Sequence, residues 1–440
     1  MSSHPIAGLW GRVASLAASL GLLGLAGGQA VAEDAAAGAT QTVYLEYQEV
    51  GSRINGWRLN LTRQAESFRK EPDWGGRHIC RGTINSAFRG VEKPGAPPGH
   101  AINLPFAWDY RRGNLHLDSN RNGDLTDDPV CSTPPDSGGY SYQTFTNLHL
   151  AIAGQAQSHR VLADLALYGY QGKDVNGGNL TWRSFWQGKA VLGGREWQVG
   201  LIEHPNHLGS TAEGYLLLRP WEERAKPFNL EDGLLAGFEY GTNLFAQGRA
   251  YRLSCTYLPG GGAKPGRELR PGLAGTLALP PGDAPKYKLE LTEQPAELGE
   301  VELSGKFIQR VVLREHQAKV PYTVVLDGPG PKVRIPIGTY RKYWAALKEK
   351  DAEAFCHHRD WLNPRPVTIT GRNVAMLPMG GPLTNWVSIE GRGRTLSLEH
   401  ELLGAGGRYR LAGPADRSKP PEFAIYQNGR PVASGKFAYG

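Results

Sequence analysis

One short segment of the chain concentrates groups that bind cations. Residues 118–128 read Asp-Ser-Asn-Arg-Asn-Gly-Asp-Leu-Thr-Asp-Asp, so four carboxylates and two carboxamides stand against the single cation Arg121. Crowding these groups into a tight turn costs electrostatic repulsion, which a hard divalent cation with about six to eight oxygen ligands would remove. Ca²⁺ suits such a loop better than Mg²⁺, because Mg²⁺ demands near-octahedral geometry. The segment therefore predicts a calcium site formed by Asp118, Asn120, Asn122, Asp124 and Asp128.

The order of these residues resembles the calcium loop of EF-hand and dockerin proteins, D-x-[DN]-x-[DN]-G. The resemblance implies that Asp118, Asn120 and Asn122 supply side-chain oxygens. It also implies that Gly123 allows a sharp turn and that Asp124 offers its backbone carbonyl. The resemblance covers these eleven residues and no other part of the chain.

Two features depart from the family pattern. Pro129 occupies the place of the bidentate glutamate, so Asp127 or Asp128 must close the ligand shell, and we choose Asp128. Residues 114–117 alternate in polarity as a strand does, where the family has a helix. With Leu125 as the apolar residue that holds the loop inward, we expect a calcium loop on a β-scaffold. The alternative is an acidic turn that only joins two strands.

Other catalytic patterns are incomplete. Residues 136–139 read Asp-Ser-Gly-Gly, similar to the nucleophile motif of trypsin-like proteases, but Pro135 precedes them where that family has glycine. The only upstream His-x-Cys candidate, at 77–80, is too close to leave room for a first barrel. The sequence contains no G-x-S-x-G, H-E-x-x-H or P-loop motif. We predict no catalytic residue and lean against an enzyme.

Two histidine-containing stretches are weak metal candidates. His204 and His207 flank Pro205, which predicts a loop. Cys356, His357 and His358 are consecutive, and neighbouring side chains cannot easily converge on one ion. We interpret that stretch as a surface loop.

The N-terminus is typical of a secretory signal peptide. Arg12 precedes an apolar stretch from Val13 to Ala26, about 14 residues long and too short to span a bilayer as a helix. Ala30-Val31-Ala32 then fits a small-x-small cleavage site. We therefore expect cleavage after Ala32 and export to the periplasm or the extracellular space. The alternative is an N-terminal membrane anchor, and we expect no integral membrane segment after cleavage.

Composition indicates a folded, multi-domain chain. Removing 32 of the 440 residues leaves 408, enough for two or three domains. The net charge of the whole chain is +7, which is mild and does not indicate a nucleic-acid partner. The four cysteines permit two disulfides in an oxidising compartment, and free buried thiols are the alternative. We hypothesise a bridge between Cys80 and Cys131, because both lie in the first expected domain and Cys131 follows the acidic loop by three residues.

Alternating polarity and frequent turn residues predict a mainly β protein with two or three sheet or sandwich domains. We expect hairpins around Gly193-Gly194 and Asn428-Gly429, the residues that two-residue turns favour. The stretch 340–355 could be helical, but strands around a turn at Lys350 are favoured. The expected domains are 33–258, 285–365 and 366–440, with a Gly/Pro-rich linker at 259–284 and a last module that resembles an immunoglobulin-like sandwich in architecture.

Three functions remain open from the sequence. The first is an exported, calcium-binding protein with a structural or binding role, whose partner could be a cell-envelope glycan or protein. The second is a carbohydrate-binding protein, if exposed tryptophans stack on sugars; the candidates are Trp74, Trp108, Trp182, Trp186, Trp221 and Trp361. The third is a secreted hydrolase with an unrecognised site.

Overall fold

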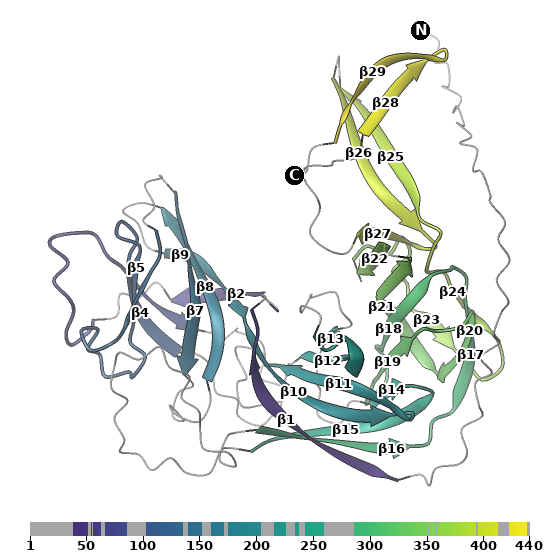
Figure 1. The fold of residues 1–440 in the computed structure, drawn as a ribbon, viewed down its shortest axis with the longest axis horizontal. Coiled ribbons are helices and arrows are strands. Elements are labelled where there is room, and N and C mark those ends of the chain that lie inside the picture. The colour runs from purple at the N-terminus through teal and green to yellow at the C-terminus, as the bar shows by residue number, and fades with distance from the viewer. Residues whose placement is uncertain are drawn as a thin grey trace. The chain divides into compact units, whose positions relative to one another are not determined.

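The computed structural model confirms a mainly β protein. It describes residues 38–51, 54, 56–62, 67–85, 103–134, 140–151, 160–170, 175–203, 215–225, 234–236, 243–258, 286–350, 352–357, 359–392, 395–411 and 422–437. The expected signal peptide and the expected linker at 259–284 lie outside these residues. Strands dominate Figure 1, and within the described residues the only helical element is the short 3₁₀ turn η1, Trp221–Glu223.

The strands form two large sheets, one small sheet and one separate hairpin. The eight-stranded sheet has the order β6-β5-β4-β3-β2-β9-β8-β7. Its strands are β2 (Gly56–Thr62), β3 (Cys80–Asn85), β4 (Asn103–Asp109), β5 (Asn114–Leu117), β6 (Val130–Ser132), β7 (Tyr140–Ala151), β8 (Arg160–Tyr170) and β9 (Val175–Trp182).

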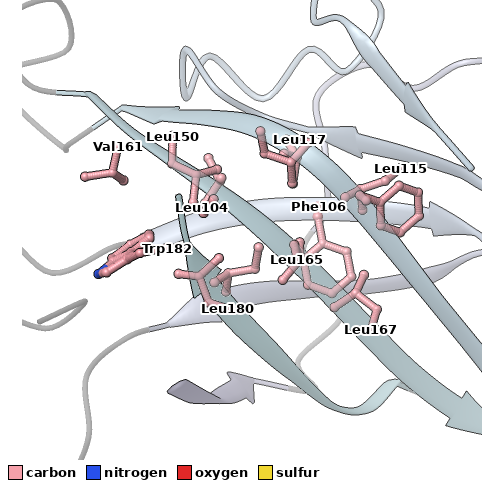
Figure 2. Packing of buried hydrophobic residues seen from close by; sticks show 14 of the residues in the cluster. Leu104, Phe106, Leu115, Leu117, Leu150, Val161, Leu165, Leu167, Leu180 and Trp182 are labelled. Carbon is pink, nitrogen blue, oxygen red and sulfur yellow. The ribbon is translucent and has the colours of Figure 1, made fainter. Parts of the chain in front are cut away.

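The eight-stranded sheet folds over so that its two halves share a core. Apolar side chains of β4 and β5 lie opposite those of β7, β8 and β9, as Figure 2 shows for Phe106 and Leu165. The Trp108 indole nitrogen on β4 donates to the Gln143 side-chain oxygen on β7 at 2.6 Å. Because the buried indole and carboxamide satisfy each other, the two halves are joined by a polar contact inside an apolar core. This sheet carries the acidic segment.

The larger sheet has sixteen strands, in the order β13-β12-β11-β10-β1-β16-β15-β14-β19-β18-β21-β22-β27-β26-β25, with β23 paired to β21. Its first strands are β1 (Thr40–Glu49), β10 (Ser184–Leu192), β11 (Arg195–Ile202), β12 (Tyr215–Pro220), β13 (Leu234–Ala236), β14 (Asn243–Ala246), β15 (Arg249–Leu258) and β16 (Lys286–Gln294). The others are β18 (Ile308–Glu315), β19 (Tyr322–Asp327), β21 (Gly338–Glu349), β22 (Ala352–His357), β23 (Val367–Ile369), β25 (Thr384–Arg392), β26 (Thr395–Gly404) and β27 (Gly407–Leu411).

Part of the larger sheet is buried on both faces. Val312 points into one core and its neighbours Val311 and Leu313 into another. The second core is closed by the three-stranded sheet β20-β17-β24, formed by β17 (Leu298–Leu303), β20 (Lys332–Pro336) and β24 (Ala375–Leu377). A strand covered on two sides needs apolar residues at successive positions, which explains why β18 does not alternate in polarity.

The turns follow the local sequence. The hairpin β10–β11 closes at the pair Leu192↔Arg195 around Gly193 and Gly194, which have φ of 56° and 80°. Residues 340–349 and 352–355 are strand, as favoured, and Lys350 after β21 has φ of 56°. The last hairpin joins β28 (Glu422–Gln427) to β29 (Arg430–Lys436) around Asn428-Gly429. Each turn holds left-handed backbone, which glycine and asparagine tolerate best; Lys350 adopts it without that preference.

The C-terminal strands extend the larger sheet. β27 pairs with β22 at Ala354↔Leu411 and Phe355↔Arg410, so the sheet runs across the boundary expected near 365. β28 and β29 form a sheet of their own. Within the described part of the chain, no helix has the length and apolar character needed to cross a membrane.

Candidate functional site

The acidic segment connects β5 to β6, which pair antiparallel with His116 opposite Val130. Both flanking elements are strands, and the alternation before Asp118 predicted the first of them. The resemblance to EF-hand loops is confined to the sequence of the loop. The Asp118 backbone N–H donates to the Pro105 carbonyl on β4 at 2.9 Å. The segment therefore starts from a position fixed by the sheet.

Side-chain oxygens along the segment turn back onto its own backbone. The Gly123 N–H donates to Asp118 Oδ2 at 3.1 Å, and the Asn122 N–H donates to Asn120 Oδ1 at 2.9 Å. The Asp124 N–H donates to Asn122 Oδ1 at 2.6 Å. Gly123 has φ of 73°, a left-handed conformation that glycine adopts without strain. The chain is thus curled so that oxygens from three predicted ligands lie along its inner side.

Two carboxylates at the ends of the segment are buried and incompletely satisfied. Asp118 is 3% exposed and Asp128 is 8% exposed. Asp128 Oδ1 accepts hydrogen bonds from the Ser119 N–H and hydroxyl at 3.2 and 2.5 Å. Asp118 Oδ1 and Asp128 Oδ2, in contrast, are buried with no hydrogen-bond partner. An ionised oxygen without a donor is costly inside a protein.

Like charges lie close together at the end of the segment. Burial raises the pKa of the Asp128 carboxyl, and the charges of Asp118 and Asp127 raise it further. The pKa of the nearby Arg121 guanidinium is lowered by burial, which outweighs the opposite effect of Asp118. Asp118 and Asp128 therefore repel each other in a poorly solvated place, while Arg121 attracts Asp118.

The other two carboxylates have different partners. Asp124 Oδ1 accepts from the Thr126 N–H at 2.9 Å, and Asp124 Oδ2 accepts from Lys70 Nζ at 3.3 Å. The Asp124 side chain is thus occupied, which fits its expected role through the backbone carbonyl. Asp127 accepts from the amide nitrogens of Asn120 and Asn122 at 3.2 and 2.7 Å. Of the two candidates for closing the shell, Asp128 is the one with an unpartnered buried oxygen.

Few carboxylates are available to a cation at the acidic segment. No group of three or more His, Cys, Asp or Glu side chains arranged to hold a metal occurs within the described residues. A cation here would rely on Asp118 and Asp128 for charge. Its remaining ligands would be neutral oxygens from Asn120, Asn122, the Asp124 carbonyl and water, which Ca²⁺ accepts.

A distant stretch of the chain holds the segment in place. Lys70 donates its N–H to the Gly123 carbonyl at 3.1 Å and accepts from the Leu125 N–H at 3.0 Å. Leu125 is 1% exposed and packs with Ile79, Ala107 and the partly buried Trp74. Burial of Leu125 agrees with its expected role. Sequence reasoning missed the contacts of Lys70 and Trp74 with the segment, because nothing local marks a contact across about 50 positions of sequence.

The tryptophans proposed for sugar stacking do not form an exposed row. Trp108, Trp182, Trp186 and Trp361 are between 0% and 5% exposed, and Trp74 and Trp221 are partly buried. The first four are core residues, as most tryptophans in β proteins are.

Sequence reasoning also missed a buried carboxylate. Glu203, 3% exposed, accepts from the Tyr287 hydroxyl at 2.6 Å and from the Trp186 indole at 2.8 Å. These donors hold the carboxylate inside the larger sheet, so the arrangement is structural.

The cysteine hypotheses need correction. Cys80 pairs with Trp108, Trp108 with Leu115, and Leu115 with Cys131 in adjacent strands. The two cysteines are therefore three strand spacings apart, roughly 14 Å, whereas a disulfide needs Cα atoms within about 7 Å. All four cysteines are free thiols. The surface-loop interpretation of 356–358 is also wrong for its first two residues, because Cys356 and His357 lie on strand β22 and Cys356 is 0% exposed.

Several candidates lie outside the described residues: the Asp-Ser-Gly-Gly motif at 136–139, His204, His207 and His358. Comparison of the chain with protein-family models, with curated proteins and with solved structures found no match.

Proposed function

We propose that this protein is an exported calcium-binding protein in which one Ca²⁺ stabilises the loop between β5 and β6. The observation that carries the proposal is the pair of buried carboxylate oxygens, Asp118 Oδ1 and Asp128 Oδ2, that have no hydrogen-bond donor. A divalent cation would satisfy both at once. Export rests on the signal-peptide pattern of residues 1–32.

The expected role of the ion is structural. The loop contacts the Lys70 stretch through two backbone hydrogen bonds and through the cluster around Leu125. An ion that holds the loop closed would therefore also stabilise the attachment of residues 67–76 to the sheet. Nothing in the proposal requires a substrate.

Isothermal titration calorimetry on the chelated mature protein tests the proposal. We expect heat of binding for Ca²⁺ at or below millimolar concentration, and loss of that heat in Asp118→Ala. Glu353→Gln is the matched control, because it removes one charge from a carboxylate on β22 that pairs with Lys348 far from the loop in sequence. If the wild-type protein shows no heat with Ca²⁺, the segment is only a turn.

Asp118→Ala could lose binding because the loop no longer folds. Asp118→Asn keeps the side-chain shape and the acceptor for the Gly123 N–H, so it separates charge from folding. We expect it to weaken Ca²⁺ binding strongly without changing the circular dichroism of the protein. Unchanged affinity in Asp118→Asn would show that the Asp118 charge is not a ligand.

A further inference from the structure

Strand β25 is a long edge of the larger sheet. Among the described strands it pairs only with β26, from Thr384↔Leu403 to Arg392↔Thr395. Figure 1 shows β25 and β26 as a long hairpin that continues from β27. An edge strand presents unpaired N–H and C=O groups to any extended chain, and proteins normally blunt such edges.

The other edges of the two large sheets are blunted. β6 and β13 are each three residues long. β7 has a register shift between Phe145 and Leu148, where Asn147 adopts φ of 58°. β25 is nine residues long, its pairing with β26 runs without a register shift, and residues 384–391 include neither Pro nor Lys. Among the described strands, its edge is therefore the longest in these two sheets that pairs without a register shift, and its only charged residues are Glu390 and Arg392.

The register identifies which groups face outward. Gly404 and Gly407 close a two-residue turn between β26 and β27, so their backbone groups bond to each other. Every second residue of β26, counted back from Gly404, therefore directs its N–H and C=O toward β27. The residues of β26 between these direct their backbone groups toward β25. Their partners on β25 are Trp386, Ser388 and Glu390, whose N–H and C=O groups therefore point toward β26. The backbone groups of Asn385, Val387 and Ile389 consequently point to the free edge.

We propose that β25 pairs with β25 of a second copy of this chain, antiparallel, about a two-fold axis at Ser388. This register bonds Val387 of each copy to Ile389 of the other, both on one face of the ribbon. These side chains are 39% and 63% exposed, so the pairing would bury apolar surface that water now contacts.

The self-pairing also avoids electrostatic conflict. Glu390, the only charged residue in 384–391, lies opposite Trp386 of the second copy, and Ser388 lies opposite itself. No like charges meet across the seam. An interface in which the same strand contributes from both sides closes as a dimer.

Crosslinking tests the register. In the proposed dimer the two Ser388 residues form a non-hydrogen-bonded pair with Cα atoms about 4.5 Å apart, a separation that a disulfide tolerates. With Cys131→Ser removing the one cysteine that is not fully buried, Ser388→Cys should give a covalent dimer on mild oxidation. Trp386→Cys, which faces Glu390 instead of itself, is the control and should remain monomeric on a non-reducing gel.

Analytical ultracentrifugation tests the edge itself. Ile389→Pro removes an N–H that does not bond to β26, so it should abolish the dimer while leaving the circular dichroism unchanged. Tyr426→Ser changes a residue of similar exposure, 64%, on β28 and should keep the dimer. A wild-type protein that is monomeric at every concentration, an Ile389→Pro variant that still dimerises, or equal crosslinking of both cysteine variants would overturn the proposal.

Discussion

Replacing Asp128 by asparagine should stabilise the protein in the absence of calcium and remove most of its response to calcium. Asparagine keeps the shape of the side chain and can donate a hydrogen bond where the carboxylate only accepts. In the structure, Asp118 Oδ1 and Asp128 Oδ2 are buried without donors. Because an unpaired buried polar group costs about 1–3 kcal/mol, we expect the calcium-free variant to be more stable by a similar amount.

The wild-type protein should gain stability from calcium that the variant does not. A ligand at about 100 times its Kd stabilises the native state by about 2.7 kcal/mol. If the part of the chain that holds the loop unfolds as a body of about 200 residues, this corresponds to a rise in Tm of about 5–11 °C. Asp128→Asn should lose most of that rise, because it removes one of the two charges available to the ion.

Differential scanning calorimetry with chelator and with excess Ca²⁺ measures both effects in one experiment. Glu353→Gln should follow the wild-type protein in both conditions. An Asp128→Asn variant that is less stable than the wild type in chelator, and that keeps the full calcium response, would refute the reasoning. If Asp128→Asn is more stable than the wild type in chelator, but the wild type does not respond to Ca²⁺, then a retained proton and no cation satisfies the two carboxylates.

Three further predictions concern the scaffold. Leu125→Ala should destabilise the protein by about 2–5 kcal/mol in denaturant unfolding, because Leu125 is fully packed. Burial raises the pKa of Glu315, whose Oε2 accepts a hydrogen bond from the Tyr322 N–H at 3.0 Å. The folded protein therefore favours the protonated carboxyl. The stability that Glu315 contributes is complete below its unfolded pKa and is lost as pH rises through its folded pKa. Glu315→Gln should accordingly raise the Tm at neutral pH relative to wild type, with the difference shrinking in acid, and an unchanged difference across pH would contradict this. Peptide mapping without reductant should recover Cys80 and Cys131 as free thiols, and a peptide joining them would contradict the strand order.

Local signals in the sequence were sufficient for the strand class and for the turns. Alternating polarity marked β5, and Gly193-Gly194 and Asn428-Gly429 marked hairpins, because backbone conformation at a two-residue turn depends on those residues themselves. The acidic segment was likewise visible, since its candidate oxygens are neighbours in the chain. Its attachment to a β-scaffold also followed from the residues before Asp118.

Only the tertiary structure decided which of those oxygens are buried and unsatisfied. Asp127 and Asp128 are adjacent and chemically identical, yet only Asp128 is enclosed, because the chain turns back there into β6. The Lys70 contact and the separation of Cys80 from Cys131 depend on strand order, which joins residues far apart in sequence. Burial and long-range pairing are properties of the whole chain, so no short pattern of residues contains them.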